Sequence, residues 1–260
     1  MMTKIRPALL AGLCTTIGLL AAMPAHADML TFNSQKPDVF VGGDSFTEAG
    51  YLMQVLEGPY TAANGISSTS GAILDPRDPF SCEVASCPAG DGSQYYAGLG
   101  DGGVTLSRAD GKGFVLNSLQ YAFLAPYAMS DGSYGKLQMS AVTMDGHAFS
   151  LSVPFLGQDG NGNFLYNTLP FNLGAGGTGL SSLTFNACFY GDDGVCVNSL
   201  DQPAYGQAQF ALDNLQVSTV AAVPEPGTWG MLLAGLALVG AVSRLRRRRP
   251  STPDATGGRV

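Results

Sequence analysis

Short apolar segments alternate with clusters of Gly, Asp, Asn and Ser along the middle of the chain. In several segments apolar and polar residues alternate with a period of two, which is typical of strands with one buried face. Leu183, Phe185, Ala187 and Phe189 share one side of such a segment. Because the segments are short and separated by turn-forming residues, we expect an all-β fold, a single sandwich or jelly-roll domain.

The clearest strands pair as hairpins. Gly103–Arg108 and Phe114–Leu124 flank a Gly-rich turn, and Lys136–Met144 and His147–Val153 flank the two-residue turn Asp145-Gly146. Residues 59–71 and 74–92 have the composition of long loops. Three further strands are predicted at Phe46–Glu57, Leu183–Phe189 and Gln209–Val217, the last with a β-bulge near Asp213-Asn214.

The N-terminal end has the three parts of a secretory signal peptide. Lys4 and Arg6 provide a positive start, residues 8–22 are mostly apolar, and Ala25-His26-Ala27 is a small-x-small site. We therefore predict cleavage after Ala27, where the signal peptidase recognises Ala25 and Ala27. The alternative is a first transmembrane helix, which the short apolar run disfavours.

The C-terminal end also has three parts. Pro224-Glu225-Pro226 is followed by an uncharged stretch, residues 227–243, and then by a cluster of arginines. About 16 apolar residues span roughly 24 Å as a helix, slightly less than a bilayer core. We expect a single transmembrane helix. Because positive charge stays on the cytoplasmic side, the body of the chain should lie in the periplasm.

This tripartite end resembles the PEP-CTERM sorting signal of Gram-negative bacteria. The resemblance covers residues 223–249 and implies recognition and cleavage near the Pro-Glu-Pro element by a membrane-embedded exosortase. The family usually stops just after its basic cluster, whereas a polar tail, residues 250–260, follows here. The alternative is a simple C-terminal anchor. The matching residues are Pro224, Glu225, Pro226, Arg244, Arg246, Arg247, Arg248 and Arg249.

The body resembles one subgroup of PEP-CTERM proteins, marked by a Gln-Phe-x-x-Asp pattern before the sorting signal. No activity transfers from that subgroup, so the resemblance bears on the fold and the destination alone. The matching segments are Gly43–Glu48, Tyr95–Leu99, Gly157–Phe164 and Gln209–Asn214.

Four cysteines, Cys82, Cys87, Cys188 and Cys196, remain after removal of the signal peptide. An even number in an exported chain indicates disulfides. We favour Cys82–Cys87 and Cys188–Cys196, because each pair brackets a loop-like sequence. The alternative is a long-range pairing between the two loops.

Charge and histidine content exclude several classes of function. The stretch from Asp28 to Val223 holds 18 acidic and 5 basic residues, a net charge near −13, so nucleic-acid binding is excluded. With two histidines in the chain, no His-rich metal site can form. We expect no metal and no cofactor; the alternative is a calcium site that joins Asp213 to Asp44 or Glu48.

The sequence therefore predicts five regions. They are a signal peptide (1–27), a β-sandwich body (28–217), a linker (218–222), a sorting signal (223–249) and a polar tail (250–260). We expect a non-catalytic structural or adhesive protein of the cell envelope or extracellular matrix. Its partners would be an exosortase-type protease, the inner membrane transiently, and exopolysaccharide. The alternatives are a carbohydrate-binding module of the exopolysaccharide matrix and, less favoured, a secreted hydrolase.

Overall fold

The computed structural model describes residues 27–65, 68–90, 92–124, 134–191, 194–197, 207–220 and 226–247. The chain divides into two compact units, Met1–Val220 and Ala221–Val260. The described part of the first unit consists mainly of antiparallel strands. The described residues of the second unit form helix α4 (Pro226–Arg247).

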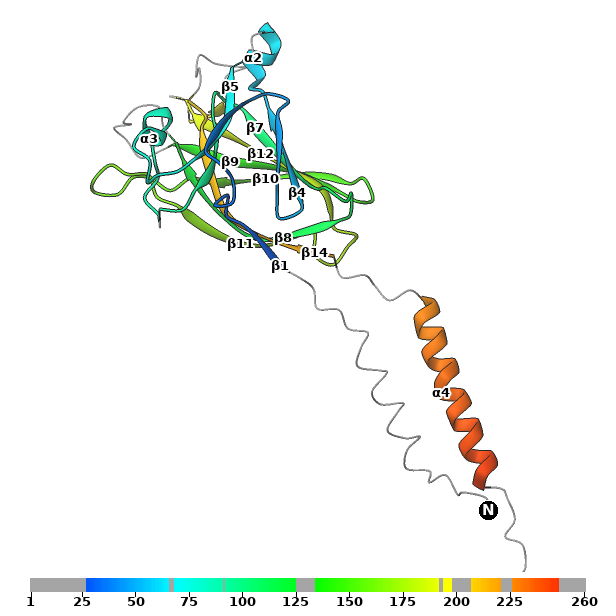
Figure 1. Ribbon diagram of the computed structural model, residues 1–260. Coiled ribbons are helices and arrows are strands. Elements are labelled where there is room, and N and C mark those ends of the chain that lie inside the picture. Colours follow the sequence, from blue (N-terminus) through cyan, green and yellow to red (C-terminus); the bar gives the residue numbers. More distant parts are fainter. Residues whose placement is uncertain are drawn as a thin grey trace, which may run out of the picture. The chain divides into compact units, whose positions relative to one another are not determined.

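The first unit contains two layers of strands that face each other (Figure 1). The first sheet has the order β3-β4-β7-β12-β9-β10, and the second has the order β2-β5-β6-β14-β8-β11. A single residue pair, Leu180 opposite Phe114, joins the sheets between β12 and β8. The strands of the first sheet are β3 (Ser45–Glu48), β4 (Tyr51–Leu56), β7 (Gly103–Arg108), β12 (Leu180–Tyr190), β9 (Gly135–Thr143) and β10 (Ala148–Pro154), with the short β13 (Cys196–Val197) beside the end of β12.

The second sheet includes the last strand of the body. It consists of β2 (Asp38–Val41), β5 (Thr69–Leu74), β6 (Tyr95–Gly98), β14 (Phe210–Thr219), β8 (Phe114–Phe123) and β11 (Asn167–Leu173), and β1 (Ala27–Leu30) pairs with the end of β14. Two short helices, α2 (Pro59–Asn64) and α3 (Ser81–Val84), lie in the connections.

The core lies between the inner faces of the two sheets. Alternation along β12 buries Leu183, Phe185 and Ala187, as the sequence predicted. At one edge of the sandwich, Phe40 on β2 stacks on Phe46 on β3 with 5.1 Å between ring centroids. Fully buried rings, among them Phe114, Phe123 and Phe185, provide much of the hydrophobic stabilisation of the body.

A second apolar cluster covers the outer face of the second sheet. Ala72, Ala97 and Ala211 are fully buried there, and Ala85, which follows α3, packs against them. The disulfide Cys82–Cys87 closes the segment around Ala85, and Cys87 also contacts the cluster. Ala85 and Cys87, in the segment between β5 and β6, thus pack on this face of the sheet.

Three of the sequence predictions are wrong in detail. Gly103–Arg108 and Phe114–Leu124 do not form a hairpin with each other, since β7 pairs with β4 and β12 in the first sheet whereas β8 pairs with β14 and β11 in the second. The range Phe46–Glu57 is not one strand but a hairpin of β3 and β4, because Ala49 and Gly50 both adopt positive φ and turn the chain. The predicted loop 59–71 contains α2 and the start of β5. The bulge near Asp213-Asn214 is confirmed, since the register with β8 shifts after Asp213 and Asn214 has φ 49°.

Both ends of the body lie on neighbouring strands. Ala27 on β1 is opposite Ser218 on β14, and β14 continues to Thr219, two residues into the range expected for the linker. The chain therefore enters and leaves the folded unit at the same place on the second sheet. Residues 1–26, and with them Ala25, lie outside the described residues.

Candidate functional site

The outer face of the first sheet is polar and largely uncharged. The register places Gln54, Thr105, Thr184, Ser140 and Ser150 in one row across β4, β7, β12, β9 and β10. Each side chain in this row is half-buried or exposed. The hydroxyls of Thr105 and Thr184 lie 2.8 Å apart, at hydrogen-bond distance. Neighbouring strands thus present hydroxyl and amide groups side by side.

A second row adds an amide pair and a hollow. Asn186 on β12 is opposite Gln138 on β9, and its Nδ2 donates a 2.9 Å hydrogen bond to the Gln138 Oε1. Ser152 on β10 is opposite Gln138 on the other side. A cavity of about 390 Å³ lies elsewhere in the molecule. The hollow on this face measures about 310 Å³ and is lined by Gln138, Ser140, Ser150, Leu151, Ser152 and Asn186.

One end of this face has an aromatic ring and a disulfide. The Lys136 ammonium lies 5.7 Å from the centroid of the half-buried Tyr190 ring, a cation–π contact. Cys188, on the same strand as Tyr190, is bonded to Cys196 on β13. The disulfide joins β13 to β12, so the end of the face is held in place.

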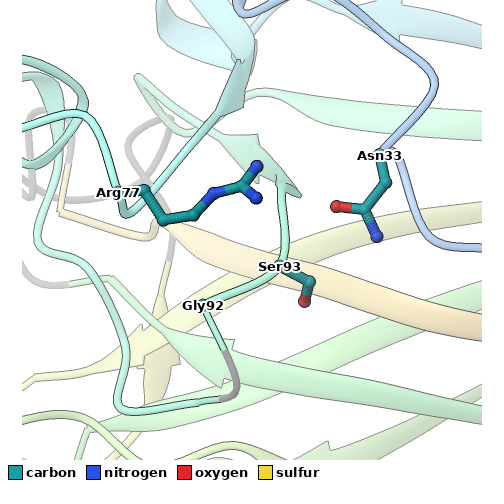
Figure 2. Close-up of a pocket in the computed structure, with 4 residues that line it drawn as sticks. All are labelled: Asn33, Arg77, Gly92 and Ser93. Carbon is teal, nitrogen blue, oxygen red and sulfur yellow. The ribbon is translucent and has the colours of Figure 1, made fainter.

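A separate polar pocket lies beside β6. It measures about 430 Å³ and is lined by Asn33, Arg77, Gly92 and Ser93 (Figure 2). Arg77 donates from Nε and Nη2 to the Asp75 carboxylate at 2.8 and 2.9 Å. The hydrogen bonds from Arg77 lower the pKa of Asp75 to about 2.

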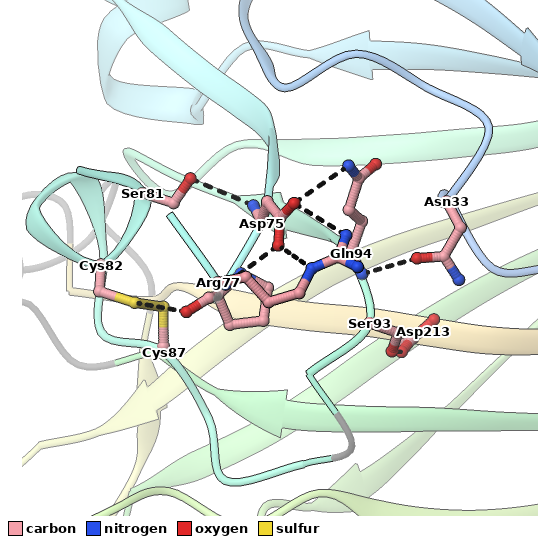
Figure 3. Close-up of polar contacts among 10 residues, drawn as sticks. Asn33, Asp75, Arg77, Ser81, Cys82, Cys87, Ser93, Gln94 and Asp213 are labelled. Atoms are coloured by element: carbon pink, nitrogen blue, oxygen red, sulfur yellow. Dashed lines mark hydrogen bonds and ion pairs between the residues drawn. A yellow bond between two sulfur atoms is a disulfide. The ribbon is translucent and has the colours of Figure 1, made fainter. Parts of the chain in front are cut away.

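The other polar groups around this pocket fasten neighbouring segments together. The Gln94 backbone N–H donates to the Asn33 Oδ1 at 3.0 Å, and the Ser93 hydroxyl donates to the Asp213 carboxylate at 2.5 Å (Figure 3). Ser81 Oγ accepts the Asp75 N–H in the same way. Because these contacts join β1–β2, α3, β6 and β14, we interpret the pocket as structural and favour the face of the first sheet as the site.

The acidic residues considered for calcium each accept hydrogen bonds from other parts of the chain. Glu48 Oε1 accepts hydrogen bonds from the backbone of Thr31 and Phe32, whereas Asp44 accepts one from the backbone of Val41. Asp213 instead accepts the Ser93 hydroxyl. Across the ranges that the structure describes, no group of three or more acidic, His or Cys side chains could hold a metal ion.

The structure describes part of the predicted sorting residues. Pro226 is the first residue of α4, Arg244 is exposed on it, and Arg246 and Arg247 belong to its last turn. Pro224, Glu225, Arg248 and Arg249 lie outside the described residues. Within the described ranges, the helices are too short or too polar to cross a membrane. Ala27, the predicted cleavage position, begins β1.

The C-terminal end can be identified by comparison with known families. Residues 222–249 match the PEP-CTERM protein-sorting motif. The match begins two residues before Pro224 and ends at Arg249, so it contains all three elements seen in the sequence. The motif suggests an exported protein sorted by an exosortase. No curated protein matches the chain.

Among solved structures, the body is similar to carbohydrate-binding modules at low identity. A family 29 module complexed with mannohexaose has a TM-score of 0.30 and 11% identity, over 76% of this chain and 93% of that one. A family 11 module from Clostridium thermocellum, in complex with a mixed-linked tetrasaccharide, has a TM-score of 0.25 and 13% identity, over 77% and 98%.

Sequence reasoning missed the polar face of the first sheet. A signal was available, because Lys136–Met144 and Leu183–Phe189 both alternate apolar residues with Ser, Thr, Asn or Gln. The polar positions were used there only to identify the buried side. The register between strands, which aligns these positions into rows, could not be obtained from the alternation alone.

Proposed function

We propose that the chain is a non-catalytic protein of the cell surface or extracellular matrix, delivered there by its C-terminal PEP-CTERM motif. The signal peptide, residues 1–27, directs export, and the body folds and forms its disulfides in the periplasm. An exosortase-type protease then cleaves near Pro224-Glu225-Pro226 and releases the body from a transient inner-membrane anchor. The match at residues 222–249 is the observation that supports this proposal most strongly.

The side chains of α4 support a lipid environment. Leu232, Leu233, Leu236, Leu238 and Val239 are each more than half exposed in this unit. Exposed apolar side chains of this kind are unfavourable in water, which supports the proposal that lipid or protein surrounds this part of α4. Arg244 and the arginines that follow would remain at the cytoplasmic surface and orient the helix.

The end of β14 limits where cleavage can occur. Thr219 is the last residue of the strand, and its Cα is five Cα–Cα steps from that of Pro224. An extended chain covers about 3.5 Å per residue, so the cleaved segment lies within roughly 18 Å of the folded body. The protease must therefore work close to the body, and the linker length is part of the signal.

The arginine cluster offers a direct test. Replacement of Arg246, Arg247, Arg248 and Arg249 by Glu should leave full-length chain in the membrane fraction and reduce the mature form at least tenfold. Replacement of the same four residues by Lys keeps the charge and is the matched control, which should be processed normally. Unchanged fractionation and mature mass of the Glu variant would overturn the proposal.

A second function, the binding of neutral polysaccharide, is favoured by the polar face of the first sheet. The rows of hydroxyl and amide groups there match the hydrogen-bonding groups of a sugar polymer. A protein retained in an extracellular matrix would have such a polymer as its neighbour. The structural or adhesive role would then consist of attachment to it.

A further inference from the structure

We infer that the outer face of the first sheet, between Tyr190 and Gln54, is a docking surface for a neutral polysaccharide chain. The inference rests on the proposed function, since it requires that the body reaches a polysaccharide outside the cell.

The two outer faces of the sandwich differ in what covers them. The outer face of the second sheet is buried beneath Ala85 and Cys87 of the segment around α3. On the first sheet, Ser140, Ser150 and Ser152 are exposed, and the hollow of about 310 Å³ opens among them. The described part of the chain places no comparable segment against that hollow, so a ligand can reach it.

The polar groups on this face are held in fixed positions. The Asn186 amino group donates to the Gln138 side-chain oxygen. The Asn186 side-chain oxygen and the Gln138 amino group can then form hydrogen bonds with a ligand. Thr105 and Thr184 are similarly fixed by their mutual hydrogen bond. Since the paired side chains are already ordered, a ligand that binds them costs little further side-chain entropy.

The arrangement suits a long polymer. Neighbouring strands lie about 4.8 Å apart, so a row across five strands repeats the same hydroxyl or amide chemistry over roughly 19 Å. A polysaccharide likewise repeats its hydroxyl groups along its length. Many weak hydrogen bonds of this kind add up only when the ligand is extended, which favours a chain over a single sugar.

Charge selects a neutral polymer. The side chains of both rows, Gln54, Thr105, Thr184, Ser140, Ser150, Ser152, Gln138 and Asn186, are all uncharged. The body around them has a net charge near −13, which repels uronate- or phosphate-bearing polymers. The Lys136 ammonium at the end of the face is held over the ring of Tyr190.

Tyr190 gives the face an aromatic end. Its ring is half-buried and contacts the Lys136 ammonium, and Tyr190 lies opposite Cys196, which the disulfide joins to Cys188 on the same strand. A rigid ring offers apolar contact area at low entropic cost, and the C–H groups of a sugar ring can pack on it. We therefore expect Tyr190 to contribute more to affinity than any single hydroxyl of the rows.

The test measures binding of purified full-length chain in mild detergent to soluble polysaccharides by isothermal titration calorimetry. The neutral probes are hydroxyethyl cellulose, galactomannan and dextran, and the anionic probe is alginate. We expect at least one neutral probe to bind and alginate to give no signal. Binding of alginate in preference to all three neutral probes, or of none of the four, would overturn the inference.

Two variants locate the surface. The double substitution Gln138→Ala and Asn186→Ala should weaken binding at least tenfold, and so should Tyr190→Ala. The matched control is Gln120→Ala, which removes the same kind of amide pair, Asn214 Nδ2 to Gln120 Oε1 at 2.9 Å, from the second sheet. Unchanged affinity in both face variants, or an equal loss in the control, would place binding elsewhere and overturn the inference.

A further variant guards against loss of folding. Ser140 is exposed, so Ser140→Arg fills the hollow without disturbing the core, and it should also weaken binding tenfold at an unchanged melting temperature. Normal processing in cells without polysaccharide binding would refute this inference alone. Polysaccharide binding by a chain that cells never process would instead refute the proposed sorting.

Discussion

Substitution of Gly98 by Ala should disrupt the centre of the second sheet. Gly98 on β6 is opposite Phe210 on β14, and a Cβ atom there would overlap the Phe210 ring edge. The ring cannot move aside easily, because Phe210 is fully buried and Tyr96 lies 6.3 Å away between centroids. The Phe of the Gln-Phe-x-x-Asp pattern thus depends on a glycine one strand away.

The size of the effect follows from the overlap. Inserting a methyl group into a packed core costs about 1–3 kcal/mol, and the tight surroundings of Phe210 place Gly98→Ala near about 3 kcal/mol. For a body of this size, each kcal/mol lowers Tm by about 2–4 °C, so we expect a decrease of roughly 6–12 °C. Thermal unfolding of the full chain, followed by circular dichroism, measures it.

Two further variants test whether the contact with the Phe210 ring causes the destabilisation. Gly160→Ala adds the same methyl group where no atom lies within 4 Å, and it should leave Tm unchanged. Phe210→Leu frees space beside Gly98, so the double variant Gly98→Ala with Phe210→Leu should be destabilised by less than the sum of the single ones. A Gly98→Ala protein within about 0.5 kcal/mol of wild type, or strict additivity, would refute this packing.

Two other predictions concern the disulfide of the first sheet and a buried carboxylate. Replacement of Cys188 and Cys196 by Ser should lower the free energy of unfolding by about 2.5 kcal/mol on the chain-entropy model, and an unchanged urea midpoint would contradict it. Burial raises the pKa of Glu48 above its ordinary value of 4.5, so the folded protein binds the proton of this carboxyl group more tightly than the unfolded chain does. The protonated carboxyl group therefore stabilises the fold at low pH, and this contribution is lost as the pH rises through the folded-state pKa. Glu48→Gln should remove this decrease, and parallel pH profiles of wild type and variant in urea unfolding would show that Glu48 plays no such part.

Much of the first sheet could be predicted from the sequence. Its strands have one face in the core and one in solvent, so β7, β9, β10 and β12 show the period-two alternation that identifies them. The exception is the turn between β3 and β4, where Ala49 adopts positive φ. Alanine rarely does so, and Gly50 was the turn-forming residue type beside it.

Much of the second sheet could not be predicted, for a physical reason. β5 and β6 are buried on both faces, because the segment around α3 covers their outer side, and buried strands lose their alternation. β11 includes Pro170, which argues against a strand unless it lies at an edge, as β11 does. The candidate site was missed because it depends on registers between strands far apart in sequence.

The intact mass of the protein recovered from cells tests the central claim, export and sorting by the two ends of the chain. We predict a species that begins at Asp28, ends near Pro224-Glu225-Pro226, and is four hydrogen atoms lighter than the reduced chain because of its two disulfides. A species that still extends from Met1 to Val260 would contradict the account.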